Sequence, residues 1–92
     1  MIKSWKHKGL KRFFEQGSTA GIISNHANRL ELLLSALNDA DTINDLGMPS
    51  FRLHPLTGNR KGIWSVTVSG NWRLTFEFDN GDVYILNYED YH

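Results

Sequence analysis

The chain has 92 residues, enough for one hydrophobic core but not two, so we expect a single domain spanning residues 1–92. Hydrophobic residues make up 40% and charged residues 22%, as in a folded domain, and the lack of cysteine excludes disulfides and thiolate zinc sites. The basic N-terminus is not followed by an apolar run, and no stretch is long enough to span a bilayer, so we expect a cytoplasmic protein without membrane contact.

Two helices are predicted in the first half of the chain. Residues 2–5 can form a short edge strand, and residues 7–16 have the apolar spacing of a helix. Ser24 is placed to cap a second, longer helix that ends near Ala40. Its apolar stripe consists of Ala27, Leu30, Leu33, Leu34 and Leu37. Thr42 is predicted to cap one further helical turn.

The second half of the chain is predicted to form strands. They are expected at residues 50–54, 63–68, 72–78 and 83–88. Asn80-Gly81, between the last two, is a dipeptide preferred in tight hairpin turns. A flexible polar loop is expected between the first two strands.

Strict alternation in the third of these strands predicts the architecture. Trp72, Leu74, Phe76 and Phe78 alternate with Arg73, Thr75, Glu77 and Asp79. Such a period of two puts the apolar set on a buried face and the polar set on an open one. The predicted fold class is therefore α+β, with two N-terminal helices packed on one face of an antiparallel sheet.

The net charge of zero conceals a segregation of charge along the chain. Residues 1–12 contain five basic side chains and no acid: Lys3, Lys6, Lys8, Lys11 and Arg12. A second acid-free block, from Leu46 to Phe76, contains Arg52, Arg60, Lys61 and Arg73. Each block is either solvated surface or a binding region for a polyanion, and the presence of two favours nucleic-acid binding.

Arg73 is a candidate phosphate ligand because it is predicted to lie in the middle of a strand on the open face. A guanidinium there can bind a phosphate with two parallel hydrogen bonds. The alternative is a cross-strand ion pair with Glu77 or with an acid of the C-terminal tail.

The C-terminal tail and one histidine provide candidate proton-transfer groups. Asp90 and His92 are two residues apart, so an extended tail would project both to one side with Tyr91 opposite, unless the terminus is frayed. His54, at the end of a predicted strand, is either a polar cap on the sheet or a catalytic group. His92 lies near negative charge from Asp90 and its own α-carboxylate, which favours the imidazolium, so it is predicted to be the general acid.

Together these residue types suit the cleavage of RNA, which contains its own nucleophile in the 2′-hydroxyl. Such a nuclease needs a base, an acid and a cation for the phosphorane charge, but no metal or other cofactor. His54, Asp90 and His92 would transfer protons, while Arg73 would supply the cation. Tyr91 could stack on, or hydrogen-bond to, a base or sugar.

Several segments resemble the HigB-type toxins of the RelE/ParE superfamily, also called plasmid maintenance killer proteins. The residues that carry this resemblance are 53–66 (LHPLTGNRKGIWSV), Trp72–Phe76, Asp90–His92 and Met1–Trp5, so it extends from end to end. It implies a RelE-like microbial RNase fold and a ribosome-dependent mRNA interferase, an endoribonuclease that cuts codons, often adenine-rich ones, in the A site of the 70S ribosome. It implies as catalytic residues His54, Arg73, Asp90, Tyr91 and His92.

The resemblance also implies partners. A HigA-type helix-turn-helix antitoxin would neutralise this toxin, and operator DNA would be bound only through that antitoxin. The chain departs from many relatives at Thr57, where they have a lysine. One phosphate-binding cation is therefore missing at this position, and Arg60 or Lys61 could compensate for it.

Three other functions are compatible with parts of the sequence. A ParE-like toxin without nuclease activity would inhibit gyrase, but would not need the terminal histidine. A non-catalytic RNA-binding module would use only the basic blocks. A metal site could be built from two histidines and a carboxylate, a ligand set known for iron.

Overall fold

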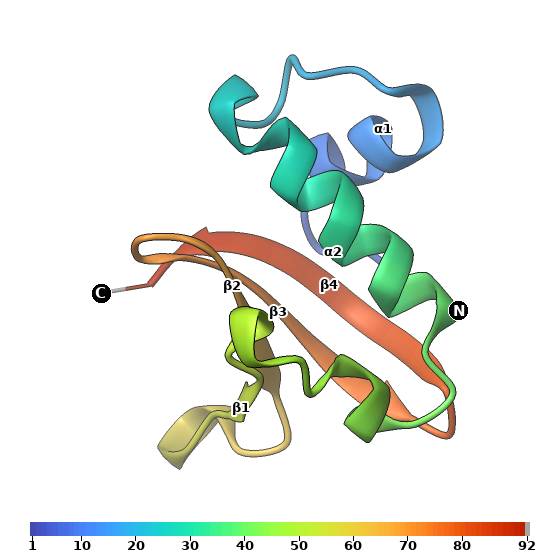
Figure 1. Cartoon of the computed structure of the whole chain (residues 1–92), viewed down its shortest axis with the longest axis vertical. Helices are drawn as coiled ribbons and strands as arrows, with labels where there is room; N and C mark the ends of the chain where they lie inside the picture. The colour runs from blue at the N-terminus through green and yellow to red at the C-terminus, as the bar shows by residue number, and fades with distance from the viewer. Residues whose placement is uncertain (92) are drawn as a thin grey trace.

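A computed structural model describes residues 1–91, and these residues form two layers (Figure 1). Helices α1 (Lys8–Gln16) and α2 (Ala27–Asp39) lie together on one side of a four-stranded sheet. Its strands are antiparallel and follow the chain order: β1 (His54–Pro55), β2 (Trp64–Ser69), β3 (Trp72–Asp79) and β4 (Asp82–Asp90). The predicted α+β class, with two helices on one face of an antiparallel sheet, is confirmed.

Helix α1 has well-defined ends. At its start, the backbone N–H of Leu10 donates to Nδ1 of His7 at 2.9 Å. At its end, Gly17 adopts a left-handed conformation (φ 74°), and its N–H donates to the carbonyl of Phe13. A glycine suits this position because a Cβ would be strained there.

Helix α2 begins later than the sequence predicts. Residues Ser24–His26 form a 3₁₀ turn, and the α-helix starts only at Ala27, so the prediction that Ser24 caps the helix is wrong. The Ser24 side chain makes no capping bond because its own residue already lies inside the turn. The cap predicted at Thr42 is confirmed, since Thr42 and Asp45 form a reciprocal capping box at the 3₁₀ turn Ile43–Leu46.

Two predicted strands differ in the structure. Residues 2–5 lie beside β4, but they form only isolated parallel bridges, from Ile2 to Val83 and from Trp5 to Leu86. The strand predicted at residues 50–54 is wrong, because Pro49–Phe51 is a 3₁₀ turn and only His54 of that stretch enters the sheet. A proline at the start of this turn favours helical geometry, and burial of Phe51 holds it against the core.

The core fills the space between the two layers. Helix α2 contributes Leu30, Leu33, Leu34 and Leu37, all fully buried, at the spacing of one helical face. The sheet contributes Val66, Val68, Leu74, Phe76, Val83, Leu86 and Tyr88. The opposite face of the sheet is not covered by either helix, so it is free to carry polar side chains. In the described part of the chain, no helix is long and apolar enough to cross a membrane.

Candidate active site on the open face of the sheet

Strand register aligns polar residues in two rows across the open face. Directly opposite residues share a face, because side chains alternate along each strand. One row contains His54, Ser65, Thr75 and Asn87; the next contains Thr67, Arg73 and Glu89. His54, on the edge strand, and Arg73, in the interior of the sheet, therefore project from the same face.

A cavity of about 300 Å³ lies on this face and brings three predicted site residues together. His54, Arg73 and Tyr91 line it. The other lining residues are Arg52, which belongs to the second basic block of the sequence, and Leu53, Ser65 and Thr67, which were not predicted as site residues. Two of them carried a usable signal, since Ser65 and Thr67 alternate with Val66 and Val68, just as Arg73 alternates with Leu74.

A β-bulge in β4 determines which tail side chains reach this face. Between the pairs Glu77–Tyr84 and Thr75–Asn87, β4 has one residue more than β3. Ile85, inside this bulge, has a positive φ of 48°, which is rare for a β-branched residue. The extra residue shifts the alternation of side chains along β4 by one place. Leu86 and Tyr88 are therefore buried, whereas Asn87 and Glu89 lie on the open face.

The three tail residues do not all lie in the cavity. Tyr91 lines it with its side chain 40% exposed, whereas Asp90 pairs with Trp72 in the register and is not a lining residue. His92 lies outside the described residues. The structure thus brings Tyr91 to Arg73 and His54, whereas Asp90 is not among the residues that line the cavity.

The Arg73 guanidinium is oriented by the turn between β2 and β3. Its Nη1 donates to the carbonyl of Gly70 at 2.7 Å and to that of Trp72 at 3.3 Å. Within residues 1–91, Arg73 forms no ion pair with a carboxylate, so the alternative of a pair with Glu77 is wrong. A cation held by neutral carbonyls keeps its charge for an anionic ligand.

Arg29 of helix α2, which was not predicted as a site residue, bonds to two segments beside the cavity. Its guanidinium donates to the carbonyl of Thr67 at 3.0 Å and to that of Ser50 at 2.6 Å, and it lies over the Phe51 ring. These bonds tie the segment that precedes His54 to the adjacent strand β2. No sequence signal distinguishes this arginine from a solvated one, because its partners are backbone carbonyls far along the chain.

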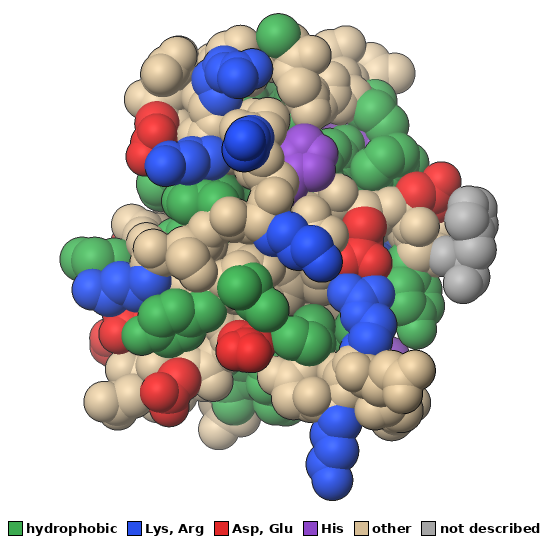
Figure 2. Space-filling model, turned by 180° about the vertical axis from the view of Figure 1, so that it is seen from behind, with side chains coloured by type: hydrophobic (Ala, Val, Ile, Leu, Met, Phe, Trp, Pro, Cys, Tyr) green, Lys and Arg blue, Asp and Glu red, His purple; other side chains and the backbone are tan. Residues whose placement is uncertain are grey.

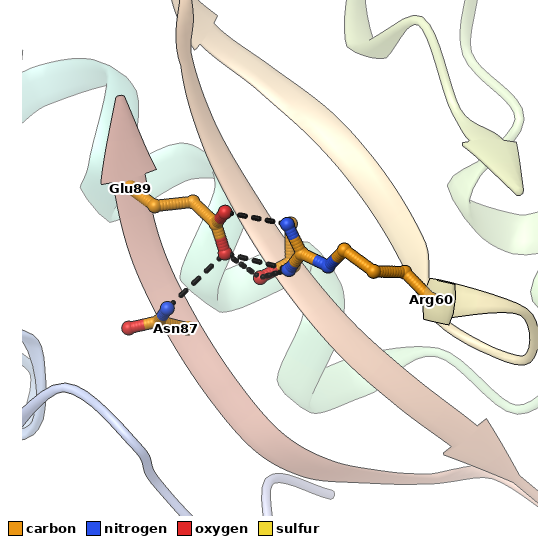
Figure 3. Close-up of polar contacts among 4 residues, drawn as sticks. Arg60, Asn87 and Glu89 are labelled. Atoms are coloured by element: carbon orange, nitrogen blue, oxygen red, sulfur yellow. Dashed lines mark hydrogen bonds and ion pairs between the residues drawn. The ribbon is translucent and has the colours of Figure 1, made fainter. Parts of the chain in front are cut away.

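Arg60, predicted to contact RNA or the ribosome, is bound to Glu89. The side chain reaches across β3 to the carboxylate on β4 (Figure 3), with two parallel contacts of 2.7 and 2.8 Å. The bond to Arg60, assisted by bonds from Thr75 and Asn87, lowers the pKa of Glu89 to about 2 against the opposing effect of burial. The same bond raises the pKa of Arg60.

The remaining basic residues singled out by sequence are exposed. They are Lys3, Lys6, Lys8, Lys11, Arg12 and Lys61. Figure 2 shows the side of the molecule opposite that of Figure 1, where Lys and Arg side chains are interspersed with Asp and Glu side chains. Folding therefore intermixes charges that are segregated along the sequence. Among the described residues, no group of three His, Cys, Asp or Glu side chains could hold a metal ion.

Comparison with known proteins supports the resemblance drawn from the sequence. Residues 3–92 match the family model described as the RelE-like toxin of type II toxin–antitoxin system HigB. Endoribonuclease HigB of Proteus vulgaris is 54% identical over 92 residues, which is the full length of both chains. Toxin HigB-1 of Vibrio cholerae is 34% identical over 94 residues, covering this whole chain and 98% of that protein.

Solved structures show the same fold at low sequence identity. YafQ from E. coli strain BL21(DE3) superposes with a TM-score of 0.63 at 17% identity, covering 98% of this chain and 91% of the other. A YoeB–YefM complex from Staphylococcus aureus has a TM-score of 0.60 at 15% identity, with 97% and 95% covered. These likenesses extend the agreement from sequence to architecture.

Proposed function

The chain belongs to the HigB family of RelE-like toxins of type II toxin–antitoxin systems, and we propose that it is a ribosome-dependent mRNA endoribonuclease that inhibits translation. Endoribonuclease activity follows from the family and from the HigB relative that is 54% identical over its full length. The observation that supports the location of the active site is the cavity that His54, Arg73 and Tyr91 line together.

In the proposed reaction, the 2′-oxygen of a ribose attacks the adjacent phosphorus. A base removes the 2′-hydroxyl proton, the bond from phosphorus to the 5′-oxygen breaks, and an acid protonates the departing oxygen. His54, Asp90 and His92 are the proposed proton-transfer groups, with His92 as the acid. Arg73 stabilises the negative charge on the phosphorane, and Tyr91 stacks on a neighbouring base. The products are a 2′,3′-cyclic phosphate and a 5′-hydroxyl, formed without a metal ion.

As a toxin of a toxin–antitoxin system, the chain has a cognate antitoxin, and we propose one of the HigA type. The solved complex of a protein with the same fold is consistent with such pairing, because it contains YoeB bound to YefM. Operator DNA would be bound through the antitoxin alone. The exposed lysines of residues 1–12, with Arg12 and Lys61, are proposed to contact ribosomal RNA, which places the action in the cytoplasm.

The ParE-like alternative gains no support from the comparisons. The matching family model and both curated relatives are HigB toxins, and one of them is an endoribonuclease. A gyrase-inhibiting function therefore has no basis in the relatives that this chain matches.

Primer extension on a reporter mRNA, with and without ribosomes, tests the proposed function directly. Wild-type protein should produce discrete cuts only with ribosomes, and Arg73→Ala should lose them. Arg73→Lys is the matched variant, because it keeps the charge but cannot form two parallel hydrogen bonds to a phosphate. Its activity should fall between the other two.

Three further measurements bear on the mechanism. Cleavage should continue in EDTA, and single-turnover cleavage should slow in Asp90→Asn and in His92→Gln. Full activity in Arg73→Ala would refute the site, and unchanged single-turnover rates in His92→Gln would refute the assignment of the general acid.

A further inference from the structure

Two oppositely charged residues face each other on the open face of the sheet without pairing. Arg73 of β3 and Glu89 of β4 are direct register partners and share that face. The Cβ atoms of such partners lie about 4.5–5.5 Å apart, close enough for an arginine and a glutamate to form an ion pair. In the described residues, Arg73 instead bonds to the carbonyls of Gly70 and Trp72.

The Glu89 carboxylate is held by three other side chains (Figure 3). Its Oε1 accepts from Nη1 of Arg60 at 2.7 Å. Its Oε2 accepts from Nη2 of Arg60 at 2.8 Å, from Oγ1 of Thr75 at 2.6 Å and from Nδ2 of Asn87 at 3.1 Å. Both carboxylate oxygens therefore form bonds toward the neighbouring row of the sheet, which contains Thr75 and Asn87. Arg73 lies in the other row, opposite Glu89.

We propose that Arg60 is a positioning residue, which holds Glu89 away from Arg73 and so leaves the Arg73 guanidinium available for the substrate phosphate. This inference rests on the proposed nuclease function. Arg60 acts through Glu89 and does not touch the RNA. This positioning role takes the place of the role that the charge pattern predicts for Arg60, which is to contact RNA as a cation.

The pKa of Glu89 agrees with this role. The Arg60 bond lowers it to about 2, so Glu89 is ionised at physiological pH in the wild-type protein. A carboxyl group with the ordinary pKa of about 4.3 is also ionised at neutral pH. If Arg60 is removed, the guanidinium of the register partner, Arg73, lies on the same face of the sheet. Charge-assisted bonds of this kind are short and strong, so the carboxylate would compete with a phosphate for Arg73.

A two-step substitution experiment separates this role from the others. Arg60→Ala should reduce ribosome-dependent cleavage by roughly 10- to 100-fold, the effect of occupying one charge-assisted phosphate contact. Arg60→Ala combined with Glu89→Gln should recover activity to within a few-fold of wild type, because a neutral glutamine does not compete for Arg73. Glu89→Gln alone completes the cycle and should lose less activity than Arg60→Ala.

Thermal unfolding of the same variants distinguishes positioning from a merely structural role. Arg60→Ala and the double variant both lack the Arg60–Glu89 ion pair, so both should unfold below the temperature of wild type. Recovery of activity in the double variant without recovery of the unfolding temperature indicates positioning. The matched control is Arg60→Ala combined with Glu77→Gln, which removes an acid of the same face that does not bind Arg60, and its activity should stay as low as that of Arg60→Ala.

Binding provides a readout that does not depend on catalysis. A single-stranded 2′-O-methyl RNA, which cannot be cleaved by 2′-oxygen attack, should bind more weakly to Arg60→Ala and regain affinity in the double variant. A double variant as inactive as Arg60→Ala would overturn the proposal, and so would an Arg60→Ala protein with wild-type activity. If instead the wild-type protein shows no ribosome-dependent cleavage, the proposed function has failed, while the binding series still tests Arg60.

Discussion

The backbone N–H of Tyr91 donates a 2.7 Å hydrogen bond to the carbonyl oxygen of Asn71, in the turn between β2 and β3. This bond extends the pairing of β3 and β4 past their last register pair, Trp72 with Asp90. It fixes the tail beside the Arg73 cavity at the level of the backbone, so the Tyr91 side chain can be changed without releasing the chain.

Tyr91→Ala is therefore expected to lower cleavage without lowering stability. Loss of one base–aromatic stack should weaken RNA binding by roughly 5- to 100-fold. Tyr91→Phe keeps the ring and should retain most of the activity. The measurements are cleavage of a reporter mRNA and thermal unfolding, and a large fall in unfolding temperature for Tyr91→Ala would contradict the anchoring of the tail by its backbone.

Stability should depend on acid through Glu89. Its pKa of about 2 in the folded chain lies below the ordinary value of about 4.3 in an unfolded chain. The stabilisation by its ionised form is therefore complete above about pH 5 and is lost as pH falls towards 2. Urea unfolding of wild type and Glu89→Gln should show a gap in stability at pH 7 that narrows at pH 3. A gap of constant size would show that the ion pair does not contribute.

Gly9→Ala should destabilise the fold, although alanine normally stabilises a helix interior relative to glycine. A Cβ on Gly9 would lie 2.6 Å from the carbonyl oxygen of Gly21, a backbone atom that cannot easily move. We expect a loss of about 1–3 kcal/mol, the usual cost of overpacking. Denaturant unfolding measures it, with Lys8→Ala at the adjacent exposed position as the control. A Gly9→Ala protein more stable than wild type would show that the close approach of α1 to the 17–21 loop is absent.

The cap at the start of α1 should also respond to pH. Burial lowers the pKa of His7, and its Nδ1 accepts from the Leu10 N–H, which it can do only when that nitrogen is unprotonated. The stability from this cap is present above pH 6.5 and is lost as pH falls through the lowered value.

His7→Asp tests this dependence, because aspartate is a favoured cap that stays ionised at pH 5. Denaturant unfolding at pH 7.5 and pH 5 should show a smaller fall in stability for His7→Asp than for wild type. Equal falls in the two proteins would mean that His7 protonation does not weaken the cap.

Thr57→Lys should strengthen RNA binding. Thr57 is exposed and precedes the 3₁₀ turn Gly58–Arg60, three residues after His54. Arg60 is bound to Glu89, so it is not placed to compensate for the lysine that the family resemblance leads us to expect at position 57. An added exposed cation should raise affinity for a 2′-O-methyl RNA by about 2- to 10-fold at low salt, measured by fluorescence anisotropy. Thr57→Gln, of similar length but uncharged, should show no such gain.

The sequence by itself determined the elements and the open face. The i, i+3, i+4 spacing of leucines in residues 27–37 specifies a helix with one buried side, and the alternation in residues 72–79 specifies a strand with one polar side. Both patterns are local, because each follows from the geometry of a single element. They were sufficient to place Arg73 on the uncovered face, and the end-to-end resemblance supplied the family.

Only the tertiary structure decided which groups meet on that face. The bulge at Ile85 changes which tail residues face Arg73, and it depends on pairing with β3 rather than on any composition signal. Arg60 joins Glu89 across 29 residues of sequence, although charge segregation had predicted that it would be free for RNA. The physical reason is that an ion pair depends on distance in space, which register and loop closure determine, whereas a sequence pattern reports only the periodicity of one element.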